Sequence, residues 1–132
     1  MSFYRDLVAV EEKLTAMGYR VMIPKSAMMM KRKNDFEVTH FKGVVPYETR
    51  AKLIRQNFRE IKNCDAILVI NNTKNGVRGY IGANVLMEIA VAFYFKKKIY
   101  LWNPIPNDAP YGEELLCFAA EVINRKLDGI AS

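Results

Sequence analysis

The 132-residue sequence contains one histidine, one tryptophan and two cysteines, and it has no long apolar run. Without about 18 consecutive apolar residues it lacks an ordinary membrane-spanning helix, and it shows no charged-then-apolar leader. We therefore expect a cytoplasmic protein that does not contact a membrane. Cys64 and Cys117 lack the spacing of metal ligands, and free cysteine in apolar surroundings behaves as a small hydrophobe. We expect neither a metal site nor a disulfide.

The single histidine and the excess of positive charge are weak functional signals. His40 has no Ser or Asp motif nearby, so we interpret it as a surface or hydrogen-bonded residue. The formal net charge is +6, but the basic residues are scattered and do not alternate with stacking aromatics. We expect no nucleic-acid partner. A small phosphate or a nucleotide remains compatible with this charge.

The strongest pattern lies between Asp65 and Asn103. Residues 65–70 form an apolar run rich in β-branched side chains, which is typical of a parallel strand buried on both faces. A glycine-bearing loop follows, then a helical segment over 84–95 and a second strand over 98–103. This order predicts a βαβ unit of an open α/β sheet, whose ligands bind beyond the carboxyl ends of the strands. In this chain those ends are Asn71, the 72–84 loop, the start of the helix and Asn103.

The remaining segments complete a single predicted domain over residues 1–132. Apolar residues recur at helical spacing from Phe3 to Met17, with Ser2 as a possible cap and Gly18 as the end of the helix. Further patterns predict a strand over 19–23, a helix over 48–63, a short helix over 113–120 and a strand over 121–124. The 25–47 connection has no sustained period. We therefore predict an α/β fold with about four parallel strands.

Glu88 is the candidate for chemistry, because it is the only charged residue of the 84–95 segment. Burying an unpaired carboxylate costs several kcal/mol or raises its pKa. Glu88 must therefore face a cleft, pair with a cation or take part in a reaction. A structural carboxylate near the helix N-terminus is the alternative to a functional one.

At these residues the sequence resembles the nucleoside 2-deoxyribosyltransferase-like family, especially its small members. Four segments carry the resemblance in this order: DAILVIN, NGVRGYIGANVLMEIAVAF, KKIYLWNPIP and VIN…LDGI. The opening MSFYRDL resembles the part of the family that follows its first strand. The resemblance implies a flavodoxin-like open parallel sheet with helices on both faces, here without the family's first strand.

The resemblance also implies a function: cleavage of the N-glycosidic bond of a nucleoside or nucleotide, or deoxyribosyl transfer, without cofactor or metal. Glu88 matches the family's glutamate nucleophile, which attacks the anomeric carbon and forms a glycosyl-enzyme intermediate. The expected pocket consists of Glu88 and the substrate-binding residues Ser2, Asn71, Asn72, Gly82, Asn84, Tyr47 and Tyr80.

Two alternatives to this enzyme remain. Active members of the family tend to carry an aspartate at the position of Asn71, so the second hypothesis is a non-catalytic nucleotide-binding module. Flavin binding is the third, and it would need a phosphate loop after a first strand. We also expect a homo-oligomer, a dimer, because the 84–95 helix is apolar nearly all round and the Met28–Met30 run adds apolar surface.

Overall fold

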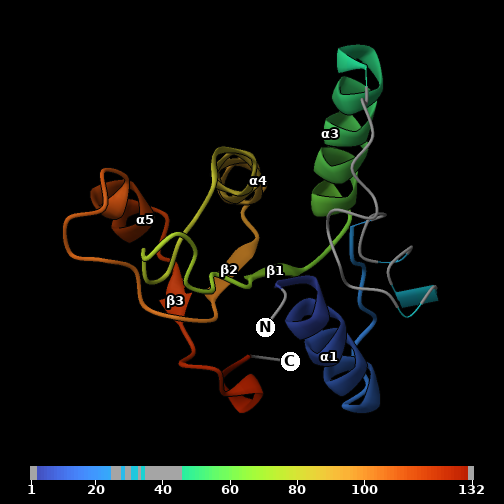
Figure 1. The fold of residues 1–132 in the computed structure, drawn as a ribbon, viewed down its shortest axis with the longest axis horizontal. Coiled ribbons are helices and arrows are strands. Elements are labelled where there is room, and N and C mark those ends of the chain that lie inside the picture. The colour runs from blue at the N-terminus through green and yellow to red at the C-terminus, as the bar shows by residue number, and fades with distance from the viewer. Residues whose placement is uncertain (1–2, 25–27, 29–30, 33, 35–45, 131–132) are drawn as a thin grey trace. The chain divides into compact units, whose positions relative to one another are not determined.

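The computed structural model describes residues 3–24, 28, 31–32, 34 and 46–130 (Figure 1). It divides into two compact units, Met1–Arg55 and Gln56–Ser132, which are considered separately below. Several residues of the sequence predictions lie outside the described part of the chain. They are Ser2, Met29, Met30 and His40.

The first unit contains helix α1, Phe3–Ala16, as the apolar period predicts. Val10 and Leu14 are buried on one face of the helix, and Val8 is buried on the opposite side. The helix ends at Gly18, whose φ of 96° lies in the left-handed region that glycine adopts without strain. There the Tyr19 N–H donates to the Leu14 carbonyl oxygen at 3.1 Å.

The strand predicted over residues 19–23 is wrong, because residues 19–24 are neither helix nor strand. A β-branched run makes a strand only where a neighbouring strand accepts and donates the ladder hydrogen bonds. No such ladder includes these residues in the described part of the chain. Among the described residues the sheet therefore has three strands, fewer than the roughly four expected.

The second unit holds the sheet, and its chain enters from helix α3, Tyr47–Lys62. Strands β1 (Ala66–Val69), β2 (Lys98–Leu101) and β3 (Glu121–Val122) are parallel and lie in the order β1-β2-β3. Ala66 aligns with Lys98 and Val69 with Leu101. Helix α4, Ala83–Tyr94, connects β1 to β2 and packs against both, so the predicted βαβ unit is confirmed (Figure 1).

Two short helices complete the second unit: α5, Gly112–Cys117, and the 3₁₀ helix η2, Leu127–Gly129. The predicted helix over 113–120 and strand over 121–124 are therefore confirmed, although both are shorter than expected. The fold is α/β with an open parallel sheet, which agrees with the predicted flavodoxin-like class at a reduced strand number.

The core of the second unit lies between α4 and the sheet. Ile89 and Ala92 of α4 are completely buried, and Ile99 and Leu101 of β2 are 2% exposed. Ile61, Val69, Ile81 and Leu115 extend the same cluster. The face of α4 that carries Ile89 thus packs against the sheet. Glu88, one residue earlier, lies on a different face of the helix.

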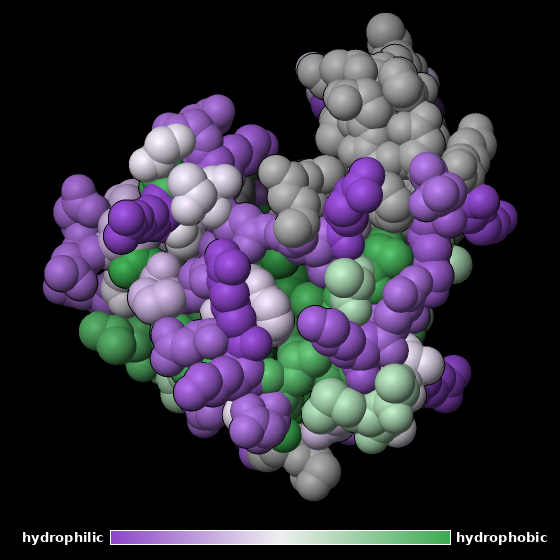
Figure 2. Space-filling view, turned by 60° about the horizontal axis from the view of Figure 1, so that its bottom comes forward, coloured by the Kyte–Doolittle hydropathy of each residue, from purple (hydrophilic) through white to green (hydrophobic). Residues whose placement is uncertain are grey.

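The surface combines charged and apolar areas. On the face drawn in Figure 2, hydrophobic atoms come to the surface between hydrophilic side chains. None of the helices in the described part of the chain has the length and apolar character needed to cross a membrane.

Candidate functional site

Asn71 joins the carboxyl ends of β1 and β2. It is only 1% exposed, and its side-chain amide donates to the Asn103 carbonyl oxygen at 2.7 Å. Its side-chain oxygen accepts from the Asn103 backbone N–H at 2.8 Å. The Asn103 side chain donates in return to the Asn71 carbonyl oxygen at 3.1 Å. This exchange, called the Asn71–Asn103 clamp below, engages both polar atoms of the Asn71 side chain.

The clamp continues to two further side chains at the same edge of the sheet. The Asn103 amide nitrogen lies 3.4 Å from the Asn72 side-chain oxygen, and the Asn103 side-chain oxygen accepts from Arg125 Nε at 2.9 Å. Arg125 is held by its own backbone N–H, which donates to the Trp102 carbonyl oxygen at 2.9 Å. The guanidinium therefore lies beyond the carboxyl ends of the strands, where this fold class binds ligands.

The loop after Asn72 is ordered by a tight turn. Asn75 and Gly76 both have positive φ, 52° and 78°, and lie between the paired residues Lys74 and Val77. Two consecutive left-handed residues with an Asn-Gly sequence are typical of a type I′ turn. Gly79 also has positive φ, and a Cβ at this position would collide with the Pro104 carbonyl oxygen. The loop after β1 is thus packed directly on the loop after β2.

The predicted residues Tyr80 and Gly82 lie at the end of this loop. Lys74 Nζ is 5.4 Å from the centre of the Tyr80 ring, a distance that suits a cation–π contact. A Cβ added to Gly82 would lie 3.6 Å from the same ring. Gly82 is also the N-cap of α4 and gives the helix no side-chain cap. The first turn of α4 therefore begins beside an aromatic ring and a cation.

Glu88 lies on the side of α4 that faces α3. It is half-buried, and in the described part of the chain it forms no ion pair. Burial raises the pKa of Glu88 above the ordinary value of 4.5, a hydrogen bond from Asn57 opposes this shift, and the nearby Glu60 carboxylate adds to it. Glu60 itself is approached by Gln56 Nε2 at 3.5 Å. The Glu60 carboxylate on α3 therefore disfavours the charged form of Glu88.

The structure brings only some of the predicted site residues together. Asn71 and Asn72 share the clamp region, and Gly82 lies beside Tyr80. Asn84 is exposed on α4. Tyr47 belongs to the first unit, is 85% exposed and has Arg50 5.6 Å from its ring centre. Ser2 lies outside the described residues.

Three residues of this region were not predicted from the sequence. No sequence motif identifies Arg125 as a site residue. Asn57 and Glu60 belong to an amphipathic helix whose pattern gives no functional signal. Asn103 was recognised as a strand end, although not as the partner of Asn71. Asparagines directly after two neighbouring strands are a signal that could have paired them.

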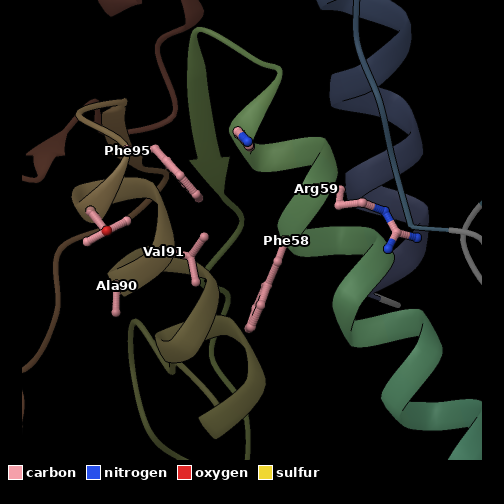
Figure 3. A pocket seen from close by; sticks show the side chains of 7 residues that line it. Phe58, Arg59, Ala90, Val91 and Phe95 are labelled. Carbon is pink, nitrogen blue, oxygen red and sulfur yellow. The ribbon is translucent and has the colours of Figure 1, made fainter.

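An apolar groove lies next to Glu88, between α3 and α4. It has a volume of about 450 Å³, and its lining includes Phe58, Val91 and Phe95 but not Glu88. Phe58 and Val91 point into the space between the helices, whereas Arg59 points away from α4 (Figure 3). Lys62 Nζ lies 5.9 Å from the Phe95 ring centre. The groove offers apolar contact area but few polar groups to orient a small ligand.

A metal centre finds no support in the part of the chain that the structure describes, where no three His, Cys, Asp or Glu side chains are grouped to hold an ion. Cys64 and Cys117 are free thiols. In comparisons with known proteins, no family model matches the chain, and no curated protein or solved structure is significantly similar to it.

Proposed function

We propose that the protein cleaves or exchanges the N-glycosidic bond of a deoxynucleoside or its monophosphate, with Glu88 as the reacting carboxylate. The observation that supports this most is the setting of Glu88. It is a half-buried carboxylate on an otherwise uncharged helix, with a raised pKa and no ion-pair partner in the described part of the chain. Carboxyl groups with such shifts concentrate at functional sites. The resemblance to the nucleoside 2-deoxyribosyltransferase-like family supports the same role.

In this reaction the ionised Glu88 attacks the anomeric carbon, and a carbon–oxygen bond forms while the carbon–nitrogen bond breaks. The base leaves with the bonding electron pair and takes up a proton from solvent water. Water, or a second base, then attacks the same carbon, loses a proton to solvent, and releases Glu88 as the carbon–oxygen bond to it breaks. The reaction needs no cofactor. Because Asn71 is engaged in the clamp, its role in this proposal is to hold the strand ends, and Asn72, Tyr80 and Gly82 remain the substrate contacts.

The alternative proposal is a non-catalytic nucleotide-binding module of the same fold. Two observations favour it: the amide of Asn71 is bound to Asn103, and Glu88 does not line the groove beside it. In this alternative Arg125 and Lys74 supply positive charge to a phosphate, and Glu88 is structural. Both proposals share the nucleoside or nucleotide ligand, and they differ in the role of Glu88 and in whether free base is released.

The deciding experiment incubates the full chain with each deoxynucleoside, its monophosphate and an acceptor base, and measures free base by chromatography. We expect release by the wild type and a loss of orders of magnitude in rate for Glu88→Gln, which keeps the shape of the side chain. Glu121→Gln, at an exposed residue of β3, is the matched control and should keep the wild-type rate.

A second measurement separates enzyme from binding module. Calorimetric titration of Glu88→Gln with the same nucleotides should show retained binding under either proposal. A slow 2-fluoro substrate should add its glycosyl mass to the wild type only. Binding without free base and without an adduct would contradict the enzyme and leave the binding module.

A further inference from the structure

We propose that an extended, basic segment of a partner protein binds along the outer edge of β3 and places apolar side chains in the groove beside that strand. In the described part of the chain β3 is the last strand of the order β1-β2-β3, so only one of its sides pairs with another strand. The groove lies between the loop after β2, α5 and β3 (Figure 1). It has a volume of about 550 Å³ and is called the β3 groove below.

The register of β3 directs two backbone groups toward this edge. Leu101 aligns with Val122, and the Ile123 N–H donates to the Leu101 carbonyl oxygen at 2.9 Å. Successive residues of a strand direct their N–H and C=O groups to opposite sides, so those of Val122 point away from β2. Among the described residues no strand pairs with them. Edge groups of this kind are the template on which an extended peptide adds as a further strand.

The β3 groove offers apolar contacts next to that edge. Val122 lines the groove and is 39% exposed, and Leu116 of α5 lines it and is 81% exposed. The buried side chains of Leu101 and Leu115 belong to the same lining. A strand added beside Val122 places every second side chain on the same face of the sheet as Val122. The groove can therefore receive alternate side chains, which is how strand addition gains specificity.

Charge selects the kind of partner. Residues 99–124 contain Asp108, Glu113, Glu114 and Glu121 but no Lys or Arg, although the whole chain has a net charge of +6. The first three line the β3 groove, and none of the four forms an ion pair within the part of the chain that the structure describes. Lys and Arg side chains of a partner are attracted to this groove. A nucleic acid, an anionic membrane and the same edge of a second copy all carry negative charge and are repelled.

The length of β3 sets the expected strength. The strand has two residues, so an added strand gains few ladder hydrogen bonds. Most of the affinity must then come from the apolar lining and the carboxylates of the β3 groove. Charge attraction between exposed groups is screened by salt. We therefore expect reversible binding that weakens as salt is added.

Fluorescence anisotropy of the full chain with a labelled peptide of about eight residues, in which valine and lysine alternate, tests this binding. The counterpart in which glutamate replaces lysine should bind about tenfold more weakly or less. It is a strict control, because a chain of net charge +6 attracts an acidic peptide if the attraction is general. Glu114→Gln removes a carboxylate of the groove and should weaken binding about two- to fivefold. Glu48→Gln, at an exposed residue of α3, is the matched variant and should leave the dissociation constant unchanged.

Strand addition itself is tested at Val122. In hydrogen exchange followed by NMR, its amide should exchange more slowly when the peptide is bound, because the added strand accepts its hydrogen bond. Val122→Pro removes this N–H without removing a hydrogen bond to β2, and it should abolish binding. Val122→Thr keeps the N–H and the β-branched shape and should retain binding. Circular dichroism checks that both variants are folded.

Three results would overturn the proposal: no binding of the basic peptide, equal binding of its acidic counterpart, or a Val122 amide that is not protected in the bound state. Displacement of the peptide by spermidine, with Val122 unprotected, would assign the β3 groove to a small polycation instead. None of these readouts involves the release of free base. The docking proposal and the proposed function can therefore fail independently.

Discussion

At the scale of single residues, Glu88 is the most informative side chain. Its isolation on an apolar helix is visible in the sequence, and the structure adds the physical consequence, a carboxyl group whose pKa is raised by burial and by Glu60. The hydrogen bond from Asn57 stabilises the ionised form of Glu88, but it does not cancel the effect of burial and of Glu60 on the pKa. Glu88 is therefore held in a setting that disfavours its charge, and this setting affects stability as well as reactivity.

The first prediction follows from the direction of that pKa shift. Between pH 4.5 and the raised folded-state pKa, the folded chain holds a proton on Glu88 that the unfolded chain releases. The free energy of unfolding is therefore not reduced by Glu88 at low pH, and it falls as pH rises through this range because the folded state disfavours the charge. Glu88→Gln removes the titration, so its stability relative to wild type should increase from pH 4.5 upward and then level off. Urea denaturation at a series of pH values measures this.

A companion variant checks the cause. Glu60→Gln removes the neighbouring carboxylate and should lower the folded-state pKa of Glu88. The pH range over which the wild-type chain loses stability should then become narrower. Glu121→Gln should leave the profile unchanged apart from a small offset. If Glu88→Gln were less stable than wild type at neutral pH, the carboxylate would be making a net favourable interaction, and the structural role would replace the catalytic one.

At the scale of elements, the Asn71–Asn103 clamp couples two strand ends that are 32 residues apart in sequence. The second prediction concerns its loss. Asn71→Ala leaves the Asn103 N–H and carbonyl without these partners, and each unsatisfied buried group costs about 1–3 kcal/mol. Thermal or urea unfolding should show a loss of that order. Asn84→Ala, at an exposed asparagine on α4, is the control and should have little effect.

An aspartate at the same position, in the variant Asn71→Asp, sharpens the test. In its protonated form the new carboxyl group can still donate to the Asn103 carbonyl oxygen, but the ionised form presents only lone pairs to it. The folded-state pKa of the introduced carboxyl group should be raised. The variant should therefore be close to wild type in acid and should lose stability as pH rises. A variant as stable as wild type at neutral pH would show that the clamp is not rigid.

Sequence reasoning predicted the elements well where the pattern was local. The helices α1, α3 and α4 follow from period, length and the stop at Gly18, and β1 and β2 follow from short apolar runs between turn residues. The strand over 19–23 failed because a strand depends on a neighbour that local composition does not specify.

The sequence likewise predicts some features of the candidate site and not others. Glu88, Asn71 and Asn72 could be selected from residue type and position alone. The facing of Glu88 toward Asn57 and Glu60 could not, because it depends on how α3 and α4 pack. Arg125 contacts Asn103 because the chain turns through two left-handed residues, with φ of 52° at Asn124 and 62° at Arg125. No local sequence motif predicts this turn.

At the scale of the whole molecule, the two compact units differ in the burial of the residues that the structure describes. The second unit has a core cluster that joins α4, the sheet and α5. In the first unit, the buried residues of α1 are Val8, Val10 and Leu14. Fewer buried contacts lower the free energy of local opening. The sequence predicts one domain over 1–132, and the test of that prediction is whether both units unfold together.

The last prediction is that backbone amides of β2 exchange with solvent far more slowly than those of α1. β2 is hydrogen-bonded on both sides, and its residues Ile99, Tyr100 and Leu101 are at most 2% exposed. Its amides should exchange only through global unfolding, and their protection should fall steeply as urea is added. The amides of α1 should open locally, with little dependence on urea. Hydrogen exchange of the full chain measures both.

Two core variants make this comparison decisive. Leu101→Ala should cost about 2–5 kcal/mol and reduce the protection of β2, while the local opening of α1 stays as it was. Leu14→Ala should do the reverse, since it removes a buried contact of α1 and leaves the sheet intact. If instead both helix and strand showed the same protection and both responded equally to either variant, the chain would unfold as one cooperative domain. The boundary near Arg55 would then have no energetic meaning.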